Sequence, residues 1–411
     1  MKRIAIIGGG ISAVTLALRL QQLGVEATVY TESSMDELRA GPLLNTVARF
    51  HPTLERERTL GVDHWRGAGH GFRRFDVSVG PPISAQFTGR TADAVEAVDF
   101  RVLLPRWVED FVRRGGEVVC GPMPSDPYEV ERLADGHDLV VVAVGRRSMS
   151  SLFPVDRARS PYEAPQRLLL AALVEGLALP EPLALSSNVS PGAGELFQMP
   201  ILTARGLGTN ILIEAVPGGP LADIVTRHRD EPGFIPGVLD ALATHAPAIA
   251  ARVDPARFGV RSRRDVLQGA ITPAVRHAYA QLHDGAPALA IGDAWITNDP
   301  ITGQGANLAS HCAFVAADAI AEGGPYDQRW GARIEAAMWK YAGPVTAWTN
   351  AFLQPPPPHV LELLQAASEH PAVADAFASG FAAPVELASA LANPDSTAAF
   401  IDATAVPQPV A

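Results

Sequence analysis

The chain has 411 residues, of which 47% are hydrophobic and 19% charged, and its formal net charge at pH 7 is −11. This composition predicts a globular protein with room for two domains, and its acidic balance argues against nucleic-acid binding. Two cysteines are too few for a disulfide framework or a metal cluster, and no apolar stretch reaches membrane-spanning length, so we expect a cytoplasmic protein with free thiols, no metal site and no membrane partner.

The first pattern along the chain is a nucleotide-binding turn. Ile4 to Ile7 is a short apolar run that ends in glycines, which predicts a buried strand. Gly8, Gly10 and Ala13 then fill the small-residue positions of the pattern G-x-G-x-x-G/A, in which the turn and the N-terminus of the next helix receive a pyrophosphate. Apolar residues at helical spacing over Val14 to Leu23 predict that helix. We expect cofactor contacts from Gly8, Gly10, Ile11, Ser12 and Ala13.

The second strand is predicted at Ala27 to Tyr30, and the side chain that binds the ribose should follow it. Thr31 stands at the usual acidic position and Glu32 comes one residue later, so both are candidates. A secretory signal is the alternative interpretation of this region, since Lys2 and Arg3 precede an apolar run. Three consecutive glycines inside the run argue against a signal helix.

The stretch up to residue 144 alternates between predicted helices and strands. Pro52 to Leu60 is a short helix candidate, and alternation over Gly71 to Phe87 predicts antiparallel strands. Helical periodicity over Asp99 to Arg113 is followed by a strand at Glu117 to Cys120. Asp138 to Val144 is a continuous apolar run, which is typical of a parallel strand covered on both faces.

Residues 166–216 have the pattern of an antiparallel sheet, with strand-length segments separated by Gly, Pro or Asn. The predicted strands are Leu168 to Leu177, Ala184 to Val189, Glu195 to Leu202 and Asn210 to Val216. Helices are predicted over residues 221–252, a strand at Ala288 to Ile291 and a helix at Ala309 to Ala321. The chain beyond residue 330 is predicted to be mostly helical, with Pro355 to Pro358 as a stiff linker.

A second informative stretch runs from Ile291 to Asn307. A carboxylate at the end of a strand can accept hydrogen bonds from a ribitol chain, and a glycine-rich turn ahead of a helix can place N–H groups against the N1–C2 edge of a flavin. The alternative is an ordinary strand–loop–helix joint with glycine caps. Because a nucleotide pattern lies upstream, we favour a flavin site; Gln304 either faces the flavin or only caps the loop. The expected contacts are Asp293, Pro300, Gly303, Gln304, Gly305, Ala306 and Asn307.

Blocks of residues spread over most of the chain match a known family in number and order. The blocks are Val29 to Thr31, Leu43 to Ala48, Val98 to Arg101, Asp138 to Val141 with Gly145, Pro191 to Leu196, Leu267 to Gly269 with Pro273 and Arg276, and Asp299 to Asn307. They resemble the FAD-dependent aromatic hydroxylases and, more specifically, the oxygenase component of two-component styrene and indole monooxygenases. By this resemblance the sequence is a divergent member.

The resemblance implies epoxidation or hydroxylation of an apolar aromatic substrate of the styrene or indole type. The oxidant would be a flavin C4a-hydroperoxide formed from O2 and reduced FAD, which a separate NADH-dependent flavin reductase delivers, and a homodimer is implied. One sequence feature supports the separate reductase. Single-component hydroxylases of this fold usually carry Asp-Gly after the third apolar strand, in a region tied to pyrophosphate and nicotinamide handling, and this chain has Val144-Gly145. We therefore predict that it does not itself oxidise NADH efficiently.

The predicted fold is α/β, with a Rossmann-type FAD-binding domain of the aromatic-hydroxylase kind, an inserted antiparallel β-sheet substrate domain and a helical C-terminal region. The FAD-binding domain is assigned to residues 1–165 and 255–325, interleaved with substrate-domain segments at residues 45–100 and 166–254. The C-terminal helical region is assigned to residues 326–411.

The resemblance also names side chains beside the flavin. Asn45 is the first catalytic candidate and Thr46 the second, since the family's Leu-Asn-Thr block lies beside the expected flavin; the alternative for Asn45 is a turn-stabilising role. Arg101 is expected to contact FAD, because the family's helix carries an arginine there, and the alternative is a surface charge. Gly145 is expected beside the cofactor.

Four residues are candidates for substrate binding. Val47 would line the same wall as Asn45. The family generally carries a histidine where Arg49 stands, and its tyrosine and histidine further along align with Phe72 and Phe75. Arg49 either accepts an anionic or hydrogen-bonding group of a larger substrate or faces solvent.

Three other functions compete with this prediction. A flavin-dependent halogenase would need a lysine near the flavin and a Trp-x-Trp-x-Ile-Pro block, whereas the chain has only Lys2 and Lys340 and lacks that block. A single-component NAD(P)H-dependent aromatic hydroxylase is disfavoured by Val144. A non-catalytic flavin-binding protein stays open, and bound flavin without oxygen transfer would identify it.

Overall fold

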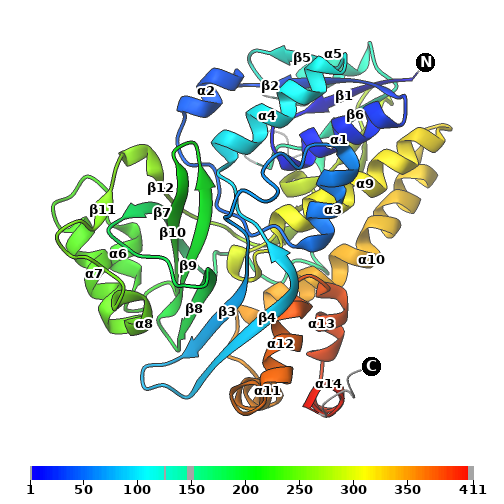
Figure 1. The fold of residues 1–411 in the computed structure, drawn as a ribbon. Helices are drawn as coiled ribbons and strands as arrows, with labels where there is room; N and C mark the ends of the chain where they lie inside the picture. Colours follow the sequence, from blue (N-terminus) through cyan, green and yellow to red (C-terminus); the bar gives the residue numbers. More distant parts are fainter. Residues whose placement is uncertain (1, 125, 146–151, 406–411) are drawn as a thin grey trace.

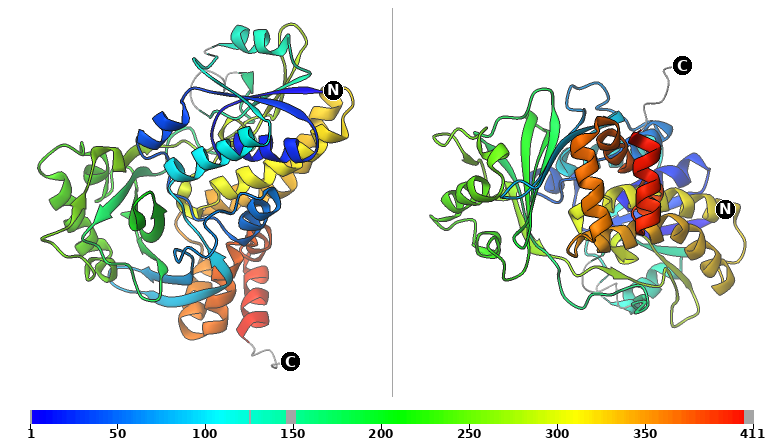
Figure 2. Two further views of the ribbon diagram at one scale, coloured as in Figure 1. Left: turned by 45° about the horizontal axis from the view of Figure 1, so that its top comes forward. Right: turned by 90° about the horizontal axis from the view of Figure 1, so that it is seen from below.

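A computed structural model describes residues 2–124, 126–145 and 152–405 (Figure 1). It contains a mostly parallel sheet, a larger mixed sheet and C-terminal helices, the last of which lie below the hairpin of the larger sheet. Figure 2 shows these C-terminal helices side by side next to the long hairpin of β3 (Phe72–Val79) and β4 (Ala85–Val95). The predicted α/β class, with an inserted sheet and a helical C-terminal region, is confirmed. None of the helices in the described ranges is long and apolar enough to cross a membrane.

The first sheet has six strands in the order β14-β15-β6-β1-β2-β5, and all neighbours are parallel except β14 and β15. The strands are β1 (Arg3–Ile7), β2 (Glu26–Thr31), β5 (Glu117–Cys120), β6 (Leu139–Val142), β14 (Tyr279–Gln281) and β15 (Pro287–Ala290). Every residue of β6 is fully buried, as a continuous apolar run in a doubly covered sheet requires. The register joins distant segments, since Ile6 pairs with both Val29 and Val141.

Helices pack around this sheet because their apolar sides match its faces. The helix α1 begins directly after Gly10, and nine of its residues are buried. Trp107 and Phe111 of α4 belong to the same core, and the Asp99 side chain caps α4 by accepting the N–H of Arg101. The helices of this part of the fold are α1 (Ile11–Gln22), α2 (Met35–Ala40), α3 (His51–Leu60), α4 (Phe100–Arg113), α5 (Pro127–Ala134), α9 (Gly305–Glu322) and α10 (Gln328–Phe352). Of these, α2 has no buried residue and lies against α4.

The second sheet follows the order β11-β7-β10-β9-β8-β3-β4, with β12 also paired to β7. Its strands are β3 (Phe72–Val79), β4 (Ala85–Val95), β7 (Leu168–Glu175), β8 (Ala184–Ser190), β9 (Gly194–Thr203), β10 (Gly206–Ala215), β11 (Gly259–Val260) and β12 (Val266–Ala270). The pair β3–β8 is parallel and joins an early hairpin to strands from later in the chain. The short strands β13 (Ala274–Val275) and β16 (Ile296–Thr297) pair separately.

Helices cover the outer side of the second sheet and the lower side of its hairpin (Figure 1). Gly89 of β4 lies directly against α12, since a Cβ atom on Gly89 would come within 2.8 Å of the Cβ of Ala378. The helices are α6 (Ala222–Thr226), α7 (Phe234–His245), α8 (Pro247–Ala250), α11 (Pro358–Glu369), α12 (Pro371–Gly380), α13 (Pro384–Ala390) and α14 (Pro394–Ala405).

The structure confirms the predicted strands and most helices, and it differs at some boundaries. The region predicted as helical over residues 221–252 is broken into three helices, and the breaks fall near Pro232 and Pro247, where a backbone donor is missing. The helix predicted from Ala309 begins earlier, at Gly305. The Pro355 to Pro358 segment joins α10 and α11, as expected for a stiff linker. The domain boundaries stay a prediction.

Candidate active site

A large cavity lies between the two sheets and the C-terminal helices. Its volume is about 2110 Å³. The four strands β1, β2, β6 and β15 all end at its wall, because the residues that follow each strand line the cavity. Ligands of open α/β sheets bind at this carboxyl edge of the strands. The cavity is therefore the candidate active site.

The glycine turn after β1 forms one end of the cavity. Gly8 has a φ of +132°, and a Cβ atom there would lie 3.1 Å from Cγ1 of Val144, so this position needs glycine. A Cβ atom on Gly10, in contrast, would meet no neighbour within 4 Å and would stand in the open space at the start of α1. Gly8, Gly10, Ile11 and Ser12 line the cavity, whereas Ala13 is fully buried between helix and sheet. This turn fits a pyrophosphate.

The two ribose candidates lie at the same end. Thr31 is buried at the end of β2, and a Cβ atom on Gly9 would lie 2.7 Å from its Oγ1. Glu32 is exposed at the cavity. Both residues line the cavity, so either can reach a ribose there.

The next part of the wall comes from β6 and β15. Gly145 follows β6 and Asp293 follows β15, and both line the cavity beside Ser12 and Gly292. Gly292 has a φ of +56°, and a Cβ atom there would lie 2.5 Å from Oγ of Ser12. The residue expected to bind the ribitol chain therefore directly follows a glycine that packs against the start of α1.

The glycine-rich turn ahead of α9 forms the neighbouring wall. Asp299 caps the 3₁₀ turn Pro300–Thr302 by accepting the Ile301 N–H over 3.1 Å, and Gly303 then takes a left-handed φ of +64°. Pro300, Gly303, Gly305 and Ala306 line the cavity. The N-terminus of α9 has no side-chain cap, so its N–H groups and positive dipole end can serve the flavin edge.

The expected cofactor contacts from Gln304 and Asn307 are corrected by the structure, since neither residue lines the cavity. The Gln304 amide donates to the carbonyl of Phe381 over 2.9 Å. Asn307 is buried; its amide donates to the carbonyls of Ala48 and Gly303, and its oxygen accepts the Phe50 N–H. Both side chains stabilise the turn through hydrogen bonds to the protein backbone on the side away from the cavity, and neither faces the cofactor site.

Asn45, Thr46 and Val47 form a further part of the wall, as predicted. The side-chain oxygen of Asn45 accepts the backbone N–H of Thr46 over 2.8 Å. The amide N–H₂ is thus the part of Asn45 that remains to donate a hydrogen bond to a ligand. The catalytic roles of Asn45 and Thr46 stay predictions.

Aromatic side chains, most of them from the C-terminal helices, form a further part of the cavity wall. Phe381 is the centre of this group, with ring-centroid distances of 6.0 Å to Phe75, 5.1 Å to Trp348 and 5.6 Å to Phe377. All four rings line the cavity. Because the amide of Gln304 holds the Phe381 carbonyl, this aromatic wall is tied directly to the flavin turn.

The expectations for Arg49 and Phe72 as substrate contacts are wrong, because both side chains lie behind the wall. Arg49 is 1% exposed, and its guanidinium is paired with the buried carboxylate of Glu57. Burial raises the pKa of Glu57, while the Arg49 charge opposes that rise. Phe72 is buried against Phe75, which is the ring that reaches the cavity.

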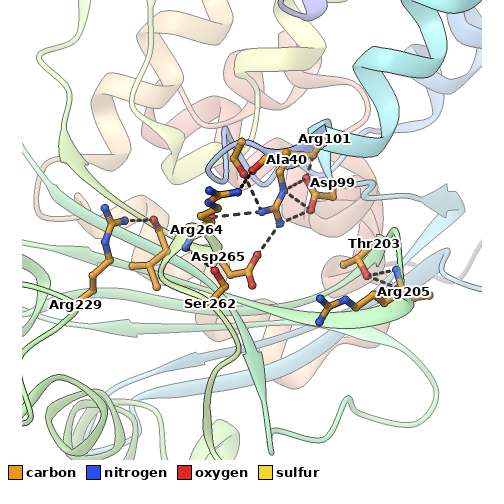
Figure 3. A network of polar contacts seen from close by, with 12 residues as sticks. Ala40, Asp99, Arg101, Thr203, Arg205, Arg229, Ser262, Arg264 and Asp265 are labelled. Atoms are coloured by element: carbon orange, nitrogen blue, oxygen red, sulfur yellow. Dashed lines mark hydrogen bonds and ion pairs between the residues drawn. The ribbon is translucent and has the colours of Figure 1, made fainter. Parts of the chain in front are cut away.

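The expected FAD contact from Arg101 is also corrected. Its guanidinium lies between Asp99 and Asp265, with Nη2 at 2.6 and 2.9 Å from their carboxylate oxygens (Figure 3). A neighbouring arginine, Arg264, donates to the carbonyl of Ala40 in the same network. Arg101 does not line the cavity. It links α4 to the segment before β12 and so joins the two sheet regions.

Sequence reasoning missed two groups at the cavity. One is the aromatic wall, although Trp348 with Phe352, and Phe377 with Phe381, stand four residues apart, which places each pair on one helix face. The other is a set of buried charges, of which Arg167, Glu195 and Asp299 line the cavity. These charges come from three distant segments, so no local pattern could have shown that they meet.

Comparison with known proteins agrees with this geometry. The family profile described as "Styrene monooxygenase A putative substrate binding domain" matches residues 145–252. The chain is 34% identical over 389 residues to styrene monooxygenase StyA of a Pseudomonas species and to that of Pseudomonas fluorescens. Each alignment covers 93% of this chain and 93% of the relative.

Solved structures show the same fold at low identity. A flavoprotein/dehydrogenase from Cytophaga hutchinsonii superposes with a TM-score of 0.68 at 11% identity and covers 96% of this chain and 95% of its own. The flavin-dependent brominase Bmp2 superposes with a TM-score of 0.63 at 14% identity and covers 97% of this chain and 92% of its own. These likenesses concern the fold alone.

Proposed function

Because the chain belongs to the styrene monooxygenase family and is a FAD-dependent monooxygenase, we propose that it epoxidises or hydroxylates an apolar aromatic substrate of the styrene or indole type. In this proposal the chain is the oxygenase of a two-component system. It receives reduced FAD from a separate NADH-dependent flavin reductase and acts as a homodimer.

One observation carries the proposal, namely a single cavity whose wall includes both glycine turns and a group of aromatic rings. Its volume of about 2110 Å³ exceeds the roughly 300–1,000 Å³ of an ordinary small-ligand pocket. It is therefore large enough for a dinucleotide cofactor and a small aromatic molecule together.

The residues at the glycine end fit FAD. The N-terminus of α1 beside Gly10 would receive the pyrophosphate, and Asp293 would accept hydrogen bonds from the ribitol hydroxyls. The N-terminus of α9, at Gly305, would stabilise negative charge on the flavin, which favours the reduced form. Val144 lines this end where single-component hydroxylases carry the carboxylate, and this difference supports a separate reductase.

At the aromatic wall, the chain's own residues would bind the substrate and exclude water. The rings of Phe75, Trp348 and Phe381 present an apolar surface that suits an arene, and they keep bulk water from the reacting oxygen. The amide N–H₂ of Asn45 would orient the substrate or the oxygen by a hydrogen bond.

When bound, reduced FAD supplies the two electrons that split O2, so that one oxygen atom enters the substrate and the other leaves as water. The reaction therefore consumes one O2 and one reduced FAD for each epoxide or hydroxylated product and returns oxidised FAD. No protein nucleophile is needed, and the protein contributes orientation, a dry cavity and charge stabilisation.

The proposal is tested by mixing the purified chain, without oxygen, with one equivalent of reduced FAD and then adding oxygenated buffer with styrene or indole. We expect a long-lived oxygenated flavin species in the absorbance trace, faster decay with the true substrate, and oxygenated product in proportion to the O2 consumed. The chain alone should not oxidise NADH at an appreciable rate.

Two results would contradict the proposal. Immediate return to oxidised FAD with hydrogen peroxide and no product would indicate a flavin-binding protein without oxygen transfer. Rapid NADH oxidation by the isolated chain would indicate a single-component hydroxylase. Sedimentation of the same preparation tests the homodimer.

A further inference from the structure

A cluster of buried carboxyl groups beside the flavin turn takes no part in the proposed reaction. Glu195 of β9 and Glu214 of β10 stand directly opposite each other in the antiparallel register. Asp299 joins them from the turn ahead of α9. Glu214 and Asp299 are 0% exposed and Glu195 is 6% exposed. Three carboxyl groups so deeply buried cannot all be ionised without compensating charge.

Arg167 is the cation that faces this cluster within the described part of the chain. Its Nε and Nη2 donate to the two carboxylate oxygens of Glu195 over 2.7 and 2.9 Å. Its Nη1 donates to the backbone carbonyls of Gln166 and Leu353. The arginine is thus engaged by Glu195 in a two-point ion pair, which leaves Glu214 and Asp299 facing each other without a counter-charge of their own.

The carboxyl groups of Glu214 and Asp299 face each other closely enough to share a hydrogen bond, and such a bond between two carboxyl groups requires a proton. Both oxygens of Glu214 and Oδ2 of Asp299 are buried, and no donor group of the described residues hydrogen-bonds to them. Burial raises the pKa of Glu214 well above its usual range, and the Asp299 and Glu195 charges raise it further. Burial also raises the pKa of Asp299, but the Ile301 N–H on its Oδ1 favours the ionised form. The proton therefore resides on Glu214.

Asp299 is the link between this proton and the cofactor end of the cavity. Its carboxylate caps the 3₁₀ turn Pro300–Thr302, which leads through Gly303 to the N-terminus of α9. We propose that Glu214 is a positioning residue for FAD binding: its neutral carboxyl donates a hydrogen bond to Asp299 and so holds the turn and the start of α9 in place. The inference rests on the proposed function only in taking α9 as the helix that receives the flavin.

The affinity for FAD should change with pH in one direction only. The pKa of Glu214 is raised in the folded protein, so its hydrogen bond to Asp299 is present below that raised pKa and lost as the pH rises through it. Two facing carboxylates would then repel each other and displace the turn. The affinity for FAD should therefore fall with rising pH, by up to about tenfold per pH unit for one proton.

The test measures FAD binding to the apoprotein by flavin fluorescence, from about pH 6 to about pH 10, without any turnover. Wild type should bind FAD more weakly as the pH rises. Glu214→Gln keeps a neutral donor at every pH, so its affinity should match the wild type at low pH and stay level. Glu214→Ala removes the donor and should weaken binding by about 10- to 100-fold even at low pH.

Glu175→Gln is the matched control, because Glu175 lies on β7 of the same sheet but is solvent-exposed and far from the turn in the sequence. It should reproduce the wild-type curve, and thermal unfolding of each apoprotein checks the fold. Each of three results would overturn the proposal. The FAD affinity of the wild type could stay constant with pH, it could change with pH in the same way in Glu214→Gln, or Glu214→Ala could bind FAD as tightly as the wild type. Failure to oxygenate styrene with the pH profile intact would instead count against the proposed function alone.

Discussion

Gly145 and Asp293 touch each other across the ends of the neighbouring parallel strands β6 and β15. A Cβ atom on Gly145 would overlap the Cβ of Asp293 and lie 3.0 Å from its carbonyl carbon. Both residues line the cavity beside the glycine turn of β1. Asp293 can therefore stand at the cofactor wall only because residue 145 has no side chain.

We predict that Gly145→Ala disturbs both the fold and cofactor binding. The added methyl group must push Asp293 away from the wall, and overpacking of this kind costs about 1–3 kcal/mol of unfolding free energy. The apoprotein should unfold at a lower temperature, and its FAD affinity should fall by at least about tenfold. Thermal unfolding and a fluorescence titration with FAD measure the two effects.

Gly10→Ala should affect only the cofactor. Gly10 has φ −80° and ψ −179°, which alanine also adopts, and its added Cβ would meet no protein atom within 4 Å. The apoprotein should keep its stability to within about 0.5 kcal/mol, while the methyl group blocks the approach of the pyrophosphate and weakens FAD binding. Normal FAD affinity in this variant would mean that the pyrophosphate binds elsewhere.

We predict that Arg49 stabilises the folded protein and does not contact the substrate. Removing one partner of a buried ion pair costs about 3–5 kcal/mol, because the other charge stays buried, so Arg49→Ala should lower the unfolding temperature strongly. The kinetics of the folded fraction should change equally for substrates with and without polar substituents. The double variant Arg49→Met with Glu57→Leu removes both charges and should recover much of the stability. A selective loss for polar substrates would restore Arg49 as a substrate contact.

Phe381→Leu is predicted to weaken substrate binding while the chain still binds FAD. The substitution keeps an apolar side chain but removes the ring that meets Phe75, Trp348 and Phe377. Losing about 0.5–1.5 kcal/mol of ring contact should raise KM by about 2- to 12-fold and divert more O2 to hydrogen peroxide. The measurement is oxygenated product formed per O2 consumed.

Phe72→Leu is the control for this variant, since its ring packs on Phe75 from behind the cavity wall. Its KM and coupling should stay close to wild type, with only a loss of stability. Equal effects from the two substitutions would mean that the aromatic wall does not contact the substrate.

Local sequence patterns were sufficient to predict most of the helices, strands and turns. The apolar run of β6, the glycine turn before α1 and the turn before α9 each depend on a few consecutive residues whose backbone needs are visible in the sequence. Family resemblance added the wall at Asn45, Thr46 and Val47, which the cavity includes. It also suggested that Arg101 contacts FAD. In the structure, the Arg101 guanidinium forms ion pairs with the nearby Asp99 and with Asp265, which is distant in the sequence.

The sequence by itself determined the α/β fold, the two glycine turns that line the cavity and the family of the chain, because these depend on short motifs and on their order. Only the tertiary structure decided which side chains face the cavity. Arg49 is buried in an ion pair with Glu57, whereas Phe75 lines the wall, and the residues around them in the sequence predict neither placement. The meeting of Glu195, Glu214 and Asp299 likewise depends on strand register and on the docking of the α9 turn. Such contacts are set by the packing of segments about 20 to 100 residues apart, whose energies no local pattern encodes.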